Sequence, residues 1–163
     1  MIALVLGGAR SGKSAVAERL CEGNVTYVAT AVLDGADPDL AARVARHRAR
    51  RPPGWATVEA LPSGVVAAVR DTPPGWTVLI DSLTTWVAAS PGFDVDADEL
   101  CAALSARPSA VVVSDEVGLG VHPSTEVGRV SRDRLGELNR RVADVADRVL
   151  LVVAGRVLPL ERL

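Results

Sequence analysis

Short, unbroken apolar runs recur along the chain, and longer segments with helically spaced apolar residues separate them. Unbroken runs of this kind are typical of parallel strands that are buried on both faces. We expect strands at 2–6, 25–30, 57–61, 76–81, 110–114 and 149–153, with an edge strand at 157–160. The segments between them predict helices at 15–20, 38–50, 62–69, 83–89, 96–106 and 129–147. The pattern therefore predicts an α/β fold, with a mostly parallel sheet flanked by helices and a C-terminal antiparallel edge strand.

The residues between the first strand and the first helix fit the phosphate-binding pattern G-x-x-x-x-G-K-[ST] at every fixed position. They are Gly7, Gly8, Ala9, Arg10, Ser11, Gly12, Lys13 and Ser14. The glycines allow the loop to curl until successive backbone N–H groups face one centre, to which the helix N-terminus adds its positive end. We expect Lys13 to reach the β- and γ-phosphates of a nucleotide and Ser14 to be a ligand of Mg²⁺.

Length and composition limit the class of protein. The chain has 163 residues, which suits one catalytic domain over 1–163. Its formal net charge of −2 gives no general attraction to nucleic acid. No apolar run approaches the roughly 20 residues of a membrane span. Cys21 and Cys101 form no metal-binding spacing, so we expect a reduced, cytoplasmic setting.

The predicted strand at 76–81 ends in a carboxylate, Asp81, after an apolar run. In P-loop enzymes an aspartate at the end of a buried strand holds Mg²⁺ directly or through water. We expect Asp81 to do so opposite Ser14. The alternative is an aspartate that caps the segment beginning at Ser82, because an acidic residue after a hydrophobic strand is common.

The predicted helix at 38–50 is unusually rich in arginine. Arg43, His47 and Arg51 are spaced by four residues and fall roughly on one helix face. Guanidinium groups suit phosphates, and they disfavour a proton on the imidazole of His47, which leaves a neutral nucleophile. The alternative is a solvated, arginine-rich surface helix.

Several blocks of the sequence occur together and in order. They are the phosphate-binding loop at 7–14, YVATA at 27–31, AARV at 41–44 with His47 and Arg51-Pro52, WATVE at 55–59, DSLTTW at 81–86, SDEVGLGV at 114–121, and Arg132-Asp133, Gly136, Asn139 and Ala146-Asp147. In these blocks the chain resembles the bifunctional adenosylcobinamide kinase / adenosylcobinamide-phosphate guanylyltransferase family, over essentially its whole length.

The resemblance implies a P-loop NTPase fold close to the RecA type, assembled as a homotrimer. It also implies two reactions. The first phosphorylates the aminopropanol hydroxyl of adenosylcobinamide with ATP or GTP. The second transfers GMP from GTP to adenosylcobinamide phosphate with loss of pyrophosphate, through a histidine to which His47 corresponds.

Nucleotide contacts are implied as well. Besides the phosphate-binding loop, they fall on Thr30, Ala31, Val32, Arg48, Arg50, Arg51, Glu59 and Asp81. Thr30 to Val32 follow the carboxyl end of a strand, where open α/β sheets bind ligands. Glu59 has a chemical reason of its own, because a carboxylate accepts from the N1–H and N2–H₂ groups of guanine, which adenine lacks. The alternative for Glu59 is an exposed carboxylate at a strand end.

Some positions depart from the family pattern. Asp115 stands where the family usually has Asn, and His122 replaces an apolar residue; we interpret His122 as a histidine on the loop surface. The stretch at 90–96 is shorter and less apolar than usual, which leaves corrinoid contacts and the kinase half open. Glu116 is either a group that positions Mg²⁺ or water, or an anchor of its loop.

Two other functions remain compatible with the phosphate-binding loop. One is a simple kinase of another small alcohol, which needs Lys13, Ser14 and Asp81 but gives His47 no role. The other is a nucleotide-binding regulatory protein that changes conformation without group transfer. Only the two-step enzyme requires a nucleophile at His47.

Overall fold

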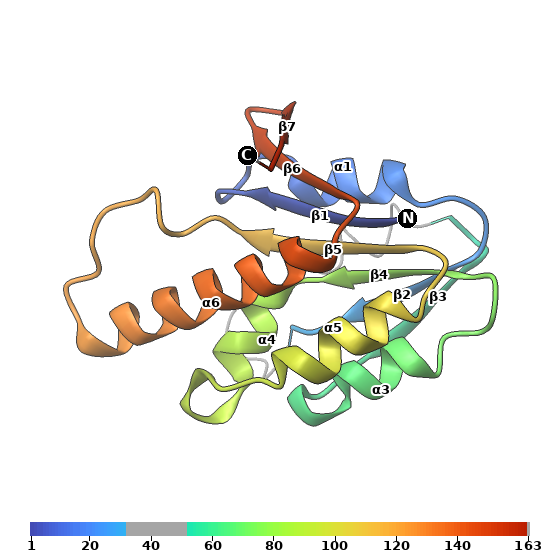
Figure 1. The fold of residues 1–163 in the computed structure, drawn as a ribbon, viewed down its shortest axis with the longest axis horizontal. Helices are drawn as coiled ribbons and strands as arrows, with labels where there is room; N and C mark the ends of the chain where they lie inside the picture. Colours follow the sequence, from blue (N-terminus) through green and yellow to red (C-terminus); the bar gives the residue numbers. More distant parts are fainter. Residues whose placement is uncertain (32–51, 163) are drawn as a thin grey trace.

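The computed structural model describes residues 1–31 and 52–162. Its strands are β1 (Ile2–Gly7), β2 (Val25–Ala29), β3 (Trp55–Glu59), β4 (Thr77–Asp81), β5 (Ala110–Asp115), β6 (Arg148–Val153) and β7 (Arg156–Leu160). They form one sheet in the order β3-β2-β4-β5-β1-β6-β7 (Figure 1). The predicted helix at 38–50 lies outside the described residues.

The sheet is parallel except at one edge. β1 pairs in parallel with both β5 and β6, β2 with both β3 and β4, and β4 with β5, whereas β7 is antiparallel to β6. Both the mostly parallel sheet and the antiparallel C-terminal strand are therefore confirmed. β3 begins two residues earlier than the predicted strand, at Trp55, and ends at Glu59.

The helices are α1 (Lys13–Leu20), α3 (Val65–Arg70), α4 (Leu83–Ala89), α5 (Ala97–Ser105) and α6 (Glu126–Val145), with 3₁₀ turns η1 (Pro62–Gly64) and η2 (Pro91–Phe93). α6 begins three residues before the predicted start, because the Thr125 hydroxyl accepts the N–H of Gly128 at 3.1 Å and caps the helix there. α4 begins as predicted, with Ser82 and Thr85 forming a capping box.

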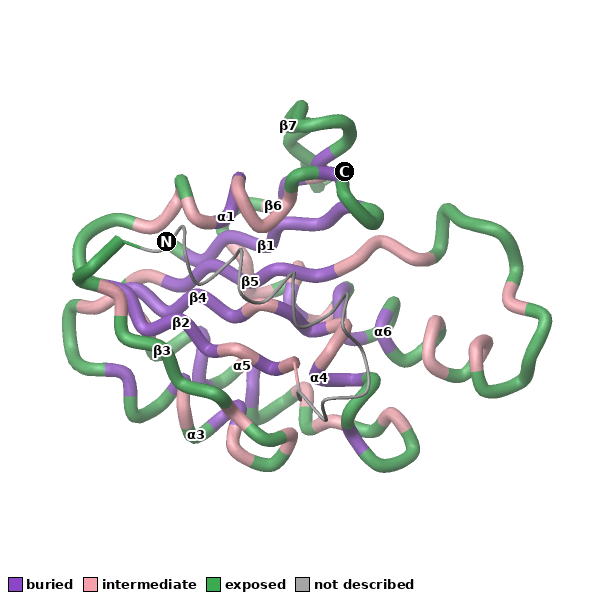
Figure 2. Tube along the Cα trace, turned by 180° about the vertical axis from the view of Figure 1, so that it is seen from behind, coloured by how far each residue is buried: buried purple, intermediate pink, exposed green. Residues whose placement is uncertain are grey.

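The helices divide between the two faces of the sheet (Figure 1). We call the face packed against α3, α4, α5 and α6 the α3–α6 face, and the opposite face, packed against α1, the α1 face. Leu4, Ile80 and Val112 point into the α3–α6 core, whereas their strand neighbours Leu79 and Val113 point toward α1. Figure 2 shows the buried strands between these layers. No helix in the described ranges is long and apolar enough to cross a membrane.

Candidate active site

The phosphate-binding loop is a tight turn between β1 and α1. The N–H of Ser11 donates to the Gly8 carbonyl at 3.2 Å, and Gly12 adopts a left-handed φ of 94° that glycine tolerates without strain. A Cβ added to Gly7 would lie 2.7 Å from the Val152 carbonyl oxygen and 2.5 Å from the Ser11 hydroxyl oxygen, so the close approach of β6 requires glycine there. The N–H of Gly155 donates to the Ser11 carbonyl at 2.8 Å, which ties the loop to the β6–β7 turn.

Lys13 and Ser14 are the first two residues of α1, so the loop ends where the helix presents its free N–H groups. The ammonium group of Lys13 folds back over the loop. It donates to the Gly8 carbonyl at 3.2 Å and forms an ion pair with the carboxylate of Asp115, at the end of β5. Gly7 and Asp115 are paired in the parallel register of β1 and β5, which explains how Lys13 reaches that carboxylate.

The strand register brings the predicted acidic residues to the same edge as the loop. Ala29, at the end of β2, is paired with Glu59 on one side and with Asp81 on the other. The side chains of Asp81 and Asp115 follow Leu79 and Val113 by two residues, so both lie on the α1 face. This edge therefore gathers a lysine, a glycine-rich loop and carboxylates from three strands.

Asp81 is half-buried and hydrogen-bonded. The hydroxyl of Tyr27, a residue that is 2% exposed, donates to Asp81 Oδ2 at 2.6 Å. Sequence reasoning missed this role for Tyr27; its only signal was a polar tip two residues before the strand end. The hydrogen bond fixes the carboxylate in one orientation, and the hydroxyl of Ser14 with this carboxylate is an oxygen donor set of the kind that Mg²⁺ prefers.

Thr30 is buried and holds the turn between β4 and α4. Its hydroxyl accepts the N–H of Ser82 at 2.8 Å and donates to the Ser82 carbonyl at 2.7 Å. It also lies 2.6 Å from the Thr85 hydroxyl. The residue at this strand end therefore fixes the backbone that directly follows Asp81. Its predicted contact with nucleotide stays a prediction, as does that of the half-buried Ala31.

The backbone of Asp115 is anchored on both sides. Its N–H donates to the Thr84 hydroxyl of α4 at 2.9 Å, and its carbonyl accepts from the Asn139 amide of α6 at 3.1 Å. Asn139 is 6% exposed. Two helices of the α3–α6 face thus set the position of a carboxylate that projects onto the α1 face.

The remaining predicted residues lie at the margin of this edge, on the loop after β5, or outside the described residues. Glu59 lies at the exposed end of β3, beside β2. Val32, His47, Arg48, Arg50 and Arg51 lie outside the described residues. The loop after β5 carries Glu116, whose carboxylate accepts the N–H of Gly118 at 2.7 Å, and the exposed His122, whose Nδ1 lies 2.9 Å from an Arg132 guanidinium nitrogen. These contacts agree with a loop anchor and a loop-surface histidine. The described ranges hold no cluster of three metal-ligating side chains.

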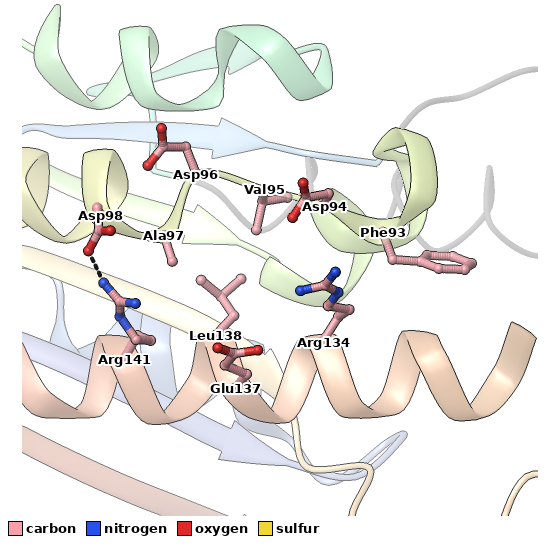
Figure 3. A pocket seen from close by; sticks show the side chains of 10 residues that line it. All are labelled: Phe93, Asp94, Val95, Asp96, Ala97, Asp98, Arg134, Glu137, Leu138 and Arg141. Carbon is pink, nitrogen blue, oxygen red and sulfur yellow. Dashed lines mark ion pairs between the residues drawn. The ribbon is translucent and has the colours of Figure 1, made fainter.

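A groove of about 430 Å³ lies on the α3–α6 face, between the segment after η2 and the middle of α6 (Figure 3). It is lined by Phe93, Asp94, Val95, Asp96, Ala97, Asp98, Arg134, Glu137, Leu138 and Arg141. Arg141 and Asp98 form an ion pair across it. The groove therefore includes part of the stretch at 90–96.

A glycine-rich loop between a buried parallel strand and a helix, with acidic strand ends beside it, defines the class of P-loop NTPases. An ATPase from the type III secretion system of pathogenic bacteria has the same fold, with a TM-score of 0.54 and 14% identity. The match covers 92% of this chain and 50% of that chain.

The sequence identifies the family within that class. Residues 3–160 match the family model described as cobinamide kinase / cobinamide phosphate guanyltransferase. The chain is 38% identical to the bifunctional adenosylcobalamin biosynthesis protein CobP of Pseudomonas aeruginosa, a match that covers 97% of this chain and 96% of the relative. It is 37% identical to the bifunctional adenosylcobalamin biosynthesis protein CobU of Escherichia coli K12, with 95% and 97% covered. The chain belongs to this family of bifunctional kinases and guanylyltransferases, which confirms the resemblance.

Proposed function

We propose that this chain phosphorylates the aminopropanol hydroxyl of adenosylcobinamide and then transfers GMP from GTP to adenosylcobinamide phosphate, releasing pyrophosphate. One observation carries the proposal: the family match runs through nearly the whole chain. The strand register supports it, because the phosphate-binding loop, Asp81 and Glu59 lie at one edge of one sheet. The kinase step uses ATP or GTP as the phosphate donor.

Each residue at this edge has a role in the proposal. The loop from Gly7 to Ser14 holds the phosphates, and Lys13 stabilises charge on the β- and γ-phosphates. The Ser14 hydroxyl and the Asp81 carboxylate hold Mg²⁺, which neutralises phosphate charge when bound. Glu59 accepts from the N1–H and N2–H₂ groups of guanine and so favours GTP in the transfer step.

The guanylyl transfer passes through His47. A neutral imidazole nitrogen attacks the α-phosphorus of GTP, a P–N bond forms, and the bond to the leaving pyrophosphate breaks. A phosphate oxygen of adenosylcobinamide phosphate then attacks the same phosphorus, and the P–N bond breaks to restore the histidine. Arg48, Arg50 and Arg51 stabilise the charge that develops on the α-phosphate oxygens.

GTP labelled at the α-phosphate tests this proposal. We expect the label to stay on the denatured protein, to resist alkali and to be released by acid, as a phosphoramidate does. His47→Asn should lose both the label and guanylyl transfer. His122→Asn is the matched control, because the chain has two histidines, and it should keep both. Label retained by His47→Asn, or label retained from the γ-phosphate, would contradict the assignment.

The proposal extends to assembly and setting. We expect a homotrimer in the cytoplasm, where ATP, GTP and reduced cysteines are maintained; Cys21 and Cys101 are both unpaired in the structure. The partners are adenosylcobinamide, adenosylcobinamide phosphate and the nucleotides. Light scattering of the purified chain measures the assembly, and a monomeric mass would contradict the trimer.

A further inference from the structure

The ammonium group of Lys13, which is proposed to bind phosphate, forms an ion pair with the carboxylate of Asp115. The Lys13 side chain is 14% exposed and that of Asp115 is 26% exposed, so water screens this pair less than a surface pair. The same ammonium group also donates a hydrogen bond to the Gly8 carbonyl at 3.2 Å. In this structure Lys13 is therefore bound to protein acceptors.

Asp115 is held in place to make this contact. Thr84 and Asn139 fix its backbone from two different helices, and its side chain lies on the α1 face at the level of Gly7. The backbone that carries the carboxylate is thus fixed beside Lys13 before a ligand arrives. A phosphate that reaches Lys13 must take the place of this carboxylate or lie beside it.

We propose that Asp115 is a positioning residue for Lys13, which it holds when no nucleotide is bound and takes back when the phosphates leave. This inference rests on the proposed role of Lys13 in phosphate binding. The carboxylate competes with the β- and γ-phosphates for one ammonium group, and it repels them directly. Asp115 therefore weakens the binding of nucleoside di- and triphosphates and of pyrophosphate, and speeds their release.

Competition between the Asp115 carboxylate and the phosphates suits a site that must release a phosphate product in each of two reactions. A spent diphosphate leaves the loop after the kinase step, and pyrophosphate leaves after the histidine takes up GMP. A carboxylate that restores its ion pair with Lys13 makes each departure easier. An Asn at this position accepts a hydrogen bond but carries no charge, so it competes less well.

Equilibrium binding without Mg²⁺ tests the inference, with GDP, inorganic pyrophosphate and GMP as probes. Asp115→Asn should bind GDP and pyrophosphate about tenfold more tightly, because one like charge near the phosphates is removed. GMP has no β-phosphate, so its affinity should not change. Steady-state kinetics should show stronger product inhibition by pyrophosphate in the same variant.

Three further variants make the result decisive. Asp115→Glu keeps the charge and should bind GDP as weakly as the wild type, whereas Asp115→Ser removes the charge and serves if the Asn variant does not fold. Glu116→Gln removes an equal charge one residue away, whose carboxylate is bound to the Gly118 N–H instead. It should leave the GDP affinity unchanged. Unchanged or weaker GDP binding by Asp115→Asn, or equal tightening for GMP or for Glu116→Gln, would overturn the inference.

The proposed function is tested separately by Lys13→Ala. If Lys13 binds the β-phosphate, this variant should lose the preference for GDP over GMP. Retention of the full preference would refute the phosphate role of Lys13 itself. Loss of that preference, together with no effect of Asp115→Asn, would refute only the role of Asp115.

Discussion

The two faces of the sheet are built from the same strands but bury different kinds of residues at the carboxyl edge. In β5, Val112 and Ser114 point into the α3–α6 core, whereas Val113 and Asp115 lie on the α1 face. Among the described residues, the α3–α6 core contains twenty buried apolar residues and the α1 core contains ten. Within the described ranges the larger of these two clusters lies on the α3–α6 face, and the carboxyl edge of the α1 face presents Lys13, Asp81 and Asp115.

One strand can support stability and chemistry at once, because successive side chains point to opposite faces. The two faces are not independent, however. Thr84 and Asn139 belong to helices of the α3–α6 face, yet they fix the backbone of Asp115. Substitutions on the two faces should therefore separate activity from stability, except at these anchors.

The largest effect should come from Lys13. We expect Lys13→Ala to abolish both activities, because the loop serves whichever nucleotide is bound and the lost charge stabilises the transition state by several kcal/mol. The unfolding free energy should change far less than the activity, because the substitution removes one ion pair and opens no apolar core. Turnover of both reactions at saturating nucleotide measures the effect, and near-normal rates would refute this placement.

Substitutions in the α3–α6 core should lower stability and leave nucleotide binding unchanged. Leu104 is fully buried in α5, and Leu104→Ala should lower the unfolding free energy by about 2–5 kcal/mol through lost burial and a residual cavity. Urea unfolding measures this loss. Where the variant is still folded, its KM for GTP should match that of the wild type. A changed KM with unchanged stability would show that Leu104 supports the nucleotide site and not the fold.

Asp81 lies at the end of the same strand as the buried Ile80. Asp81→Asn should keep the fold and raise the Mg²⁺ concentration needed for half-maximal activity by about tenfold or more, because a neutral amide is a poor ligand for a hard cation. A Mg²⁺ titration of both activities measures this. An unchanged titration would reduce Asp81 to a capping residue.

Glu59 lies at the exposed end of β3, outside both cores. Glu59→Gln should leave stability unchanged and lower the preference for GTP over ATP in the nucleotidyl transfer by about tenfold, since the paired carboxylate is lost. Competition between the two labelled nucleotides gives the ratio. If the preference survives, guanine is recognised elsewhere.

The smallest effect should come from Tyr27. Tyr27→Phe removes the 2.6 Å hydrogen bond to Asp81 and keeps the buried ring, so it should cost about 0.5–1.5 kcal/mol of stability. The Mg²⁺ requirement should rise a few-fold, because the carboxylate loses its fixed orientation. Equal Mg²⁺ titrations for Tyr27→Phe and the wild type would show that Asp81 needs no such support.

Most elements could be predicted from sequence because their signals are local. The apolar runs of β1 and β4 and the glycine pattern of the loop each occupy a few adjacent residues. The sequence predicts that α6 begins at Arg129, three residues late, after a loop indicated by Gly118, Gly120 and Pro123. The cap formed by Thr125 determines the actual start.

The candidate site was only partly predictable. A motif identifies Lys13, and a strand end identifies Asp81. Neither signal predicts which side chain forms a hydrogen bond or ion pair with them. Tyr27 and Asp81 are 54 residues apart, and Lys13 meets Asp115 only because β1 pairs with β5. Such contacts depend on strand order and register, which no local pattern contains.

The central claim is that one site, formed by the phosphate-binding loop on the α1 face, binds the nucleotide of both reactions. Titration with α,β-methylene GTP, which cannot transfer GMP, followed by displacement with ATP, tests it most directly. The account predicts one analogue per chain, complete and competitive displacement by ATP, and loss of both affinities in Lys13→Ala. Two nucleotides bound per chain, or ATP binding that leaves the analogue in place, would contradict it.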